Sequence, residues 1–219
     1  MPSAAKQAFD SNSNDVQELW SIRQGLSGKG KNANGINVMN RSAVIFITAA
    51  WESYVEDFAM EAFDHLLANA TTASQIPAKV RTLATKSIWE QKDPSRIWDI
   101  ADAGWRTYLV QHRETVRTQW LGSFNTPKTE QVNGLYRELL GIRKLSDAWS
   151  WKAMSASAAG SKLDGYVTIR GDIAHRLKHA KPVHQHVSKK YQDHVERIVD
   201  CCEAHVGQYL VDTVGSKPW

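Results

Sequence analysis

The chain has 219 residues, of which 42% are hydrophobic, and a chain of this length buries roughly 70% of its unfolded surface in a core. Its 27 Lys and Arg against 23 Asp and Glu give a formal charge of +4, which permits contact with a polyanion without requiring it. No stretch reaches the roughly 18 apolar residues of a membrane span, and the first 31 residues lack the apolar core of a signal peptide.

The two cysteines, Cys201 and Cys202, are neighbours in a strongly helical stretch, where they are poorly placed to bridge each other. Such cysteine usage fits a reducing compartment. We therefore expect a cytoplasmic protein that is neither exported nor inserted in a membrane.

The first half of the chain predicts two helices joined by a linker. The first helix is expected at residues 15–26, and the glycine-rich run at 27–35 is interpreted as a flexible linker. A long helix is expected at 40–69, because apolar residues recur there at three- and four-residue steps. These residues are Val44, Ile47, Trp51, Tyr54, Val55, Phe58, Ala62 and Leu66.

The middle of the chain continues with shorter helical patterns. A helix is expected at 79–90. A second helical pattern of apolar residues begins at Asp93-Pro94 and continues to Gly122. A loop at 123–129 then precedes a short helix at 129–140. The stretch 146–160 is rich in Ala, Ser and Trp and shows no clear periodicity.

Two helices are predicted at the C-terminal end. Ser161, followed three residues later by Asp164, resembles a capping box, so a helix is expected to begin there and to end before Pro182. The last helix is expected at 187–214. With no β alternation, the sequence predicts an all-α, single-domain bundle. It divides into an N-terminal helix with a flexible linker (1–35), the helical domain (36–214) and a short tail (215–219).

The nine tryptophans lie mostly at helical spacing, which predicts core positions for most of them. Stacking on unpaired bases is the other interpretation of so many indoles. Trp149 and Trp151, in the stretch without periodicity, are those least expected to be buried. Trp219 is expected to be loose in the tail.

A helical projection at about 100° per residue separates two polar residues of the expected 161–178 helix. His175 lies roughly 155–165° from the centre of the apolar stripe, with Gly171 beside it, and Arg170 lies roughly 55° from that centre. The stripe consists of Tyr166, Ile169, Ile173 and Leu177. His175 is therefore expected to point away from the core, and an ordinary exposed histidine is the competing interpretation. Gly171 would allow a backbone or a phosphate to approach closely.

Arg170 and His175 form the pattern R-x-x-x-x-H, and the long upstream helix contains the run WESYVE at residues 51–56. Together these features resemble the HEPN superfamily, and most closely its RiboL-PSP-HEPN branch. The resemblance covers roughly residues 38–207, with strong likeness at 43–67 and 166–175. An R-x-x-x-x-H pattern alone occurs by chance in many proteins. Its position ahead of one long final helix makes the resemblance to the family more specific.

This resemblance implies a helical bundle with extra helices that forms a homodimer, with Arg170 and His175 of both subunits in one cleft. In such a cleft an RNA 2′-hydroxyl attacks the neighbouring phosphate and leaves a cyclic phosphate, without a metal or other cofactor. His175 would act as general base or acid, because histidine titrates near neutral pH, and Arg170 would hold the scissile phosphate. The expected role is a toxin or defence effector that an antitoxin or other regulatory partner controls.

Further residues are expected to support this site. Glu52 and Glu56 share a helical face, and the resemblance suggests that they pack near the motif helix and orient its side chains. A solvated acidic edge is the other interpretation of the pair. Gly171 and Asp172 follow the motif arginine directly. A basic rim that would bind the RNA backbone consists of Arg176, Lys178, His179 and Lys181.

Two other functions remain open at this point. The position after the motif arginine is commonly polar in the family and is Gly171 here, which favours a non-catalytic module that binds RNA or a partner protein. A metal-dependent protein is the other, because four histidines cluster and a four-residue step suits a transition metal. The cluster consists of His175, His179, His184 and His186. No Cys, Asp or Glu adjoins it at ligand spacing, so we expect an exposed basic patch and no metal.

Overall fold

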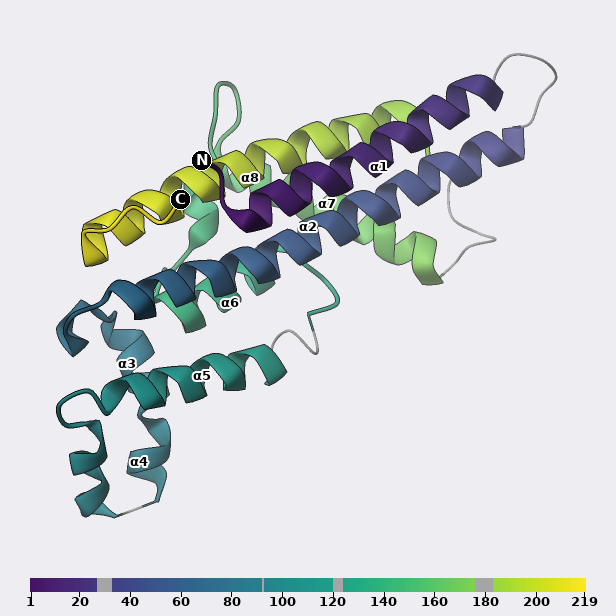
Figure 1. Cartoon of the computed structure of the whole chain (residues 1–219). Helices are drawn as coiled ribbons and strands as arrows, with labels where there is room; N and C mark the ends of the chain where they lie inside the picture. The colour runs from purple at the N-terminus through teal and green to yellow at the C-terminus, as the bar shows by residue number, and fades with distance from the viewer. Residues whose placement is uncertain (27–32, 92, 120–123, 176–182) are drawn as a thin grey trace.

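The computed structural model describes residues 1–26, 33–91, 93–119, 124–175 and 183–219, and helices form nearly all the regular structure in these ranges (Figure 1). The exception is an isolated bridge between Trp151 and Met154. The elements in chain order are α1 (Ala4–Leu26), α2 (Ala33–Asn69), η1 (Ala73–Gln75), α3 (Ala78–Ala84), α4 (Lys86–Glu90), η2 (Pro94–Ile100), α5 (Trp105–Gln119), α6 (Thr129–Leu140), η4 (Leu145–Ala148), α7 (Ala156–His175) and α8 (Gln185–Val214). The predicted all-α class is confirmed.

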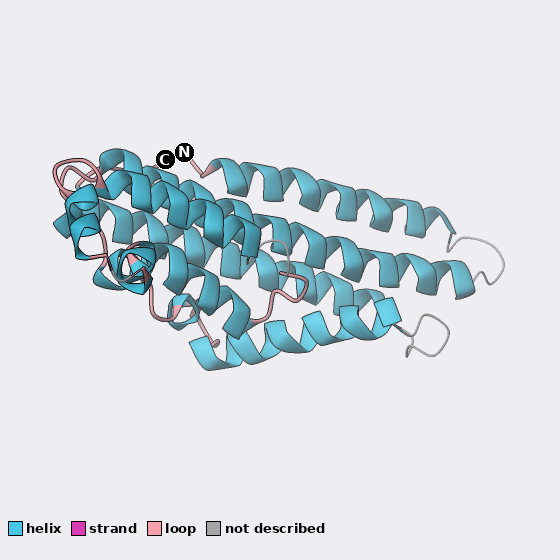
Figure 2. Cartoon of the chain, turned by 90° about the horizontal axis from the view of Figure 1, so that it is seen from below, coloured by secondary structure: helices cyan, strands magenta, loops and turns pink. Residues whose placement is uncertain are grey.

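The long helices α1, α2, α7 and α8 lie side by side, and α6 packs against α2 at the other end of the bundle (Figures 1 and 2). The short elements from α3 to α5 form an extension beside α6. Both ends of the chain lie close together in the two views, and the Ser3 backbone N–H donates to the Glu203 carboxylate of α8 (Figures 1 and 2). None of the described helices is both long and apolar enough to cross a bilayer.

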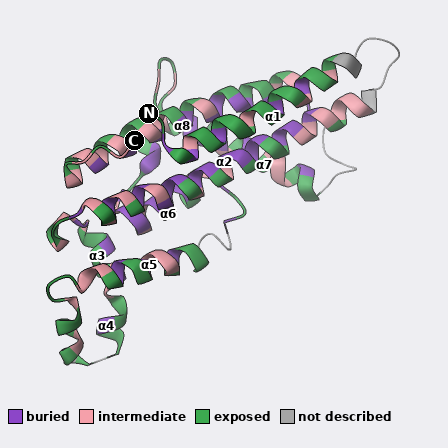
Figure 3. Ribbon diagram, in the orientation of Figure 1, coloured by how far each residue is buried: buried purple, intermediate pink, exposed green. Residues whose placement is uncertain are grey.

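The core is centred on α2, which contacts α1, α6, α7 and α8 (Figure 3). Every apolar residue of the predicted α2 stripe is buried, so the sequence periodicity located this face correctly. The apolar face expected on the last helix is buried in its middle and partly buried at its ends. Tyr191, Val195, Ile198, Cys202 and Val206 are buried, whereas Val187 and Tyr209 are partly buried. Cys201 and Cys202 are free thiols, as expected from their adjacency.

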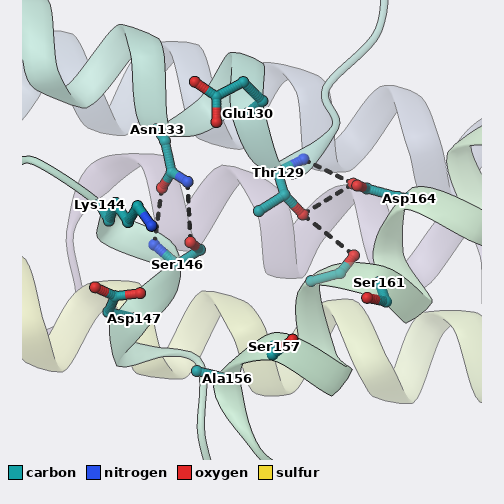
Figure 4. Close-up of a pocket in the computed structure, with 11 residues that line it drawn as sticks. Thr129, Glu130, Asn133, Lys144, Ser146, Asp147, Ala156, Ser157, Ser161 and Asp164 are labelled. Atoms are coloured by element: carbon teal, nitrogen blue, oxygen red, sulfur yellow. Dashed lines mark hydrogen bonds between the residues drawn. The ribbon is translucent and has the colours of Figure 1, made fainter.

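The start of α7 corrects one prediction. The helix begins at Ala156 and not at Ser161, because the Ser155 side chain accepts a hydrogen bond from the Ala158 N–H at 3.2 Å and caps the helix there. Asp164 has a different role. Its carboxylate accepts hydrogen bonds from the Thr129 N–H at 2.7 Å and from the Thr129 hydroxyl at 2.8 Å (Figure 4). Asp164 therefore joins α7 to the first residue of α6.

The N-terminal helix is longer than expected. It begins at Ala4, and its residues Ala5, Phe9, Val16 and Trp20 are buried in the common core. In the run interpreted as a linker, residues 33–35 belong to α2 and residues 27–32 lie outside the described part of the chain. The helix expected at 79–90 is two short helices, and the pattern beginning at Asp93-Pro94 is divided by turns at 101–104.

The tryptophans differ most from expectation. Trp149 is fully buried, and Trp151 is half-buried. Trp219 was expected to be loose, yet its ring lies 5.1 Å from that of Phe58. Conversely, Trp89 and Trp98 are exposed on the extension. Helical spacing alone does not show that Trp89 and Trp98 are exposed. Their exposure follows from their place on the outer side of the extension, where no described helix covers them.

Candidate active site

Arg170 and His175 both lie on α7, but they point in different directions. Arg170 is half-buried, and its Nη1 donates to the Asn125 carbonyl oxygen at 3.4 Å. His175 is the last residue of the helix and is exposed, as the helical projection predicts. No hydrogen bond joins the two side chains within the described part of the chain. A five-residue separation places them about 140° apart on the helix, which accounts for this.

Arg170 faces a junction of three helices. Tyr191 of α8 stacks on Tyr166 of α7 with ring centroids 4.4 Å apart, and its hydroxyl lies 3.0 Å from the Thr48 hydroxyl of α2. Burial raises the pKa of Tyr191, while the hydrogen bond to Thr48 and the charge of Arg170 oppose that rise. The guanidinium is therefore close enough to Tyr191 to act on it electrostatically.

Two carboxyl groups of α2 lie on the same side of this junction. Burial raises the pKa of Glu52, and the positive charge of Arg170 opposes the rise. Burial also raises the pKa of Glu56, to about 7, with further contributions from the negative charges of Glu52 and Asp57. Glu52 is thus close enough to Arg170 for that charge to lower its pKa, and Glu56 is a half-buried group with a pKa raised to about 7. A solvated acidic edge does not describe this pair.

The substitution Glu56→Gln tests this environment. A raised carboxyl pKa means that the folded chain binds more protons than the unfolded chain between pH 4.5 and 7, so stability falls as pH rises through this window. At pH 8 we expect the glutamine variant to have a free energy of unfolding about 1 kcal/mol above that of the wild type, after allowance for solvent screening of a half-exposed group. Near pH 4.5 the two proteins should have similar free energies of unfolding.

Urea denaturation followed by circular dichroism at a series of pH values measures this difference. Glu18→Gln, on the exposed side of α1, is the matched control and should change stability equally at all pH values. A Glu56→Gln variant that tracks the control across the series would contradict the described environment of Glu56.

Gly171 and Asp172 lie at the solvent side of α7. Gly171 is half-buried, and no atom lies within 4 Å of the position that a Cβ would take there. Asp172 is exposed. The space beside Gly171 is therefore open to a group from outside this chain, and no element of the described chain uses it.

The expected basic rim and histidine cluster are only partly visible. Arg176, Lys178, His179 and Lys181 lie outside the described residues. His184 and His186 stack with ring centroids 5.7 Å apart at the start of α8. No group of three or more His, Cys, Asp or Glu residues within the described ranges is arranged to hold a metal ion.

A polar cavity of about 300 Å³ lies where α6, η4 and α7 meet (Figure 4). Two pairs of its polar residues are joined by hydrogen bonds. Asn133 accepts from the Ser146 N–H at 2.9 Å and donates to the Ser146 hydroxyl at 2.9 Å, while Thr129 bonds to Asp164. These bonds hold the three elements together, and we assign this cavity a structural role.

Sequence reasoning missed four residues around Arg170. Tyr166 precedes Arg170 by one turn, so its position beside the motif was available from helical spacing. Thr48, Asn125 and Tyr191 come from three other segments of the chain. Their approach to Arg170 depends on how the helices pack, and no local pattern indicates it.

A family model described as RiboL-PSP-HEPN matches residues 10–208, a range that contains α2, α7 and most of α8. No curated protein and no solved structure gave a significant match. Glu52, Arg170 and His175 all fall inside the matched range.

Proposed function

The chain belongs to the RiboL-PSP-HEPN family, and from this premise we propose that it is a metal-independent endoribonuclease with a composite active site at a homodimer interface. One observation supports the proposal above all. Arg170 donates to the Asn125 carbonyl oxygen at a helix junction, where its charge acts on Glu52, while His175 is exposed at the end of the same helix. The two motif residues of one chain do not form a site together, whereas two copies can converge on one phosphate.

The proposed reaction is an internal transfer at phosphorus. A bond forms between the RNA 2′-oxygen and phosphorus, and the bond between phosphorus and the 5′-oxygen breaks. One His175 imidazole accepts the 2′-hydroxyl proton, and the protonated His175 of the second copy donates a proton to the departing 5′-oxygen. Arg170 binds the phosphate oxygens and stabilises the charge that develops on them. The products are a 2′,3′-cyclic phosphate and a 5′-hydroxyl.

The surface of α2 supports the proposed dimer. Val38 and Ile45 are 48% and 38% exposed, and they precede Glu52 at seven-residue steps, so all three share one face of the helix. A second copy placed over this face would cover both apolar side chains. The open space beside the Cβ position of Gly171 leaves room on α7 for a group of the second copy.

The alternative function is a non-catalytic module that binds RNA or a partner protein. Gly171 favours it, because the family commonly has a polar residue at this position. For either function we propose a cytoplasmic setting. For the nuclease, we propose a toxin or defence effector under the control of an antitoxin or other regulatory partner.

Incubation of the purified full-length chain with structured and unstructured RNA in EDTA tests the nuclease. We expect cleavage to continue at full rate in EDTA and to yield products with 5′-hydroxyl ends, which polynucleotide kinase labels without prior dephosphorylation. A chain that cuts neither RNA, or that loses activity when the metal is chelated, would count against the proposal. RNA binding without any product would support the non-catalytic module.

A further inference from the structure

A second pocket lies on the outer surface of α7 and α8, away from the motif residues. It has a volume of about 300 Å³, and we call it the α7–α8 pocket. Its lining residues are Trp151, Met154, Lys162, Lys190, Asp193, His194 and Arg197. None of these residues belongs to the expected active site, and the proposed reaction uses none of them.

The pocket concentrates positive charge. Lys162 of α7 and Lys190 and Arg197 of α8 all line it and are exposed, and none makes an ion pair within 4 Å to another described residue. Asp193 lies among them, so three cations and one carboxylate leave a formal charge of +2. Unpaired cations from two helices that line one pocket repel each other unless an anion binds between them. Lysine and arginine bind the phosphates of nucleic acids by charge-assisted hydrogen bonds and charge neutralisation.

Two aromatic rings, those of Trp151 and His194, line the pocket together with these cations. Trp151 is held in place by two backbone hydrogen bonds with Met154, at 3.1 and 2.8 Å. The centroids of its indole ring and the His194 imidazole are 5.4 Å apart. His194 is buried, with its Nε2 2.9 Å from the Ala159 carbonyl oxygen, so Nε2 bears the proton and the ring is fixed. The indole is therefore a positioned, half-exposed surface of the kind on which a nucleobase stacks.

The α7–α8 pocket connects to the proposed active site through a series of ring contacts, of which the one between Tyr166 and Tyr191 is stacked. The Tyr166 ring lies 5.9 Å from that of His194 and 4.4 Å from that of Tyr191, and Tyr191 is close enough to Arg170 to be affected by its charge. Lys162 and Arg170 lie eight residues apart on α7, a rise of about 12 Å. A stacked strand advances about 3.4 Å per nucleotide and an extended single strand advances further, so that length corresponds to a few nucleotides at most.

From this arrangement we propose that the α7–α8 pocket binds a nucleotide of the RNA strand a few positions from the scissile bond. Trp151 stacks on its base, and Lys162, Lys190 and Arg197 bind the adjoining phosphates. The inference rests on the proposed function for its ligand, and it adds a part of the substrate that the motif residues do not contact. It also predicts that single-stranded RNA is the preferred substrate, because a paired base is not free to stack on the indole.

The test measures binding of the full-length protein to a fluorescent single-stranded RNA of about twelve nucleotides. All of its 2′-hydroxyls are methylated, so that it cannot be cleaved. Fluorescence anisotropy gives the Kd at several salt concentrations. We expect Trp151→Ala to raise the Kd at least about fivefold and Trp151→Phe to keep most of the affinity, because phenylalanine retains a stacking surface. A Trp151→Phe variant as weak as Trp151→Ala would overturn the stacking role.

The charge variant is Lys190→Ala combined with Arg197→Ala. We expect it to lower the slope of log K against log salt by about 1.4, which is two phosphate contacts at about 0.7 each on a single strand. Lys79→Ala combined with Arg143→Ala removes the same charge from exposed positions elsewhere, and it should leave the slope almost unchanged. Equal losses of slope in the two variants would overturn the pocket as the origin of the effect.

Two further outcomes separate this inference from the proposed function. Pocket variants that bind the methylated RNA as tightly as the wild type, while the wild type cleaves unmodified RNA, would overturn the inference alone. Pocket variants with weakened binding, beside a wild type that cleaves nothing, would support the pocket and contradict the nuclease. A mononucleotide that binds the wild type as tightly as the RNA strand would overturn assignment of the pocket to a strand.

Discussion

Replacement of His175 by alanine is expected to lower the rate of RNA cleavage by about 10²–10⁴-fold, because the variant lacks the group that moves protons in the proposed reaction. The fold should be unaffected. His175 is exposed at the end of α7, and its side chain has no hydrogen bond to another described residue. Single-turnover cleavage of a labelled RNA gives the rate, and thermal melting reports the fold.

The matched control is His205→Ala. His205 is an exposed histidine of α8, and its loss should leave the cleavage rate within about twofold of the wild type. A His175→Ala variant that cleaves at the wild-type rate would remove the imidazole from the proposed mechanism. An equal loss of activity in His175→Ala and His205→Ala would also contradict a specific role for His175.

The composite site also predicts how Arg170 variants behave in the same cleavage assay. Arg170→Ala should also be inactive, and Arg170→Lys should recover little, because lysine cannot make the bidentate contact of a guanidinium. Mixed dimers of wild-type and His175→Ala subunits contain a single His175 in the cleft, which cannot act as base and acid in the same step. We expect an excess of His175→Ala subunits, after subunit exchange, to lower the activity of a fixed amount of wild type. Wild-type activity that is unchanged after subunit exchange would contradict a shared cleft.

The long helices were predictable because their apolar residues follow one face over many turns. The stripe of α2 from Val44 to Leu66 is buried throughout, since a helix of that length must cover a continuous apolar face. The start of α7 was not predictable in the same way. Ser161 and Asp164 have the spacing of a cap, but Asp164 bonds to Thr129, which lies 35 residues away. Local spacing contains no information about such a partner.

Some residues of the candidate site were predictable from local sequence, and others are placed only by helix packing. The spacing of Arg170 and His175 predicts their divergence on α7, and the run that contains Glu52 indicated the carboxylate that lies near Arg170. Tyr191 and Thr48 reach the site only because α2, α7 and α8 pack together. The same packing places Lys162 beside Lys190 and Arg197, whose spacing on separate helices shows no motif.

Trp149 is expected to be among the largest contributors to stability, although the sequence around it shows no periodicity. Its side chain is fully buried, its ring meets that of Trp51 edge-on with centroids 6.1 Å apart, and its Nε1 donates to the Cys202 thiol at 3.2 Å. Through these contacts it packs η4 between α2 and α8. Trp149→Ala should therefore lower the free energy of unfolding by about 3–5 kcal/mol, because it leaves a cavity in the centre of the core.

For a chain of this size each kcal/mol shifts the Tm by roughly 2–4 °C, so the loss should be plain in both urea and thermal denaturation. Trp98→Ala is the matched control, since Trp98 is 77% exposed and should change stability by no more than about 0.5 kcal/mol. The free energy of unfolding of Trp149→Phe should lie between those of Trp149→Ala and Trp98→Ala, because phenylalanine retains a ring against Trp51 and lacks the donor to Cys202. A Trp149→Ala chain as stable as the control would mean that the 146–160 stretch does not pack as described. The N-terminal half of α7, which begins within this stretch and contains Lys162, would then lose its anchor in the core.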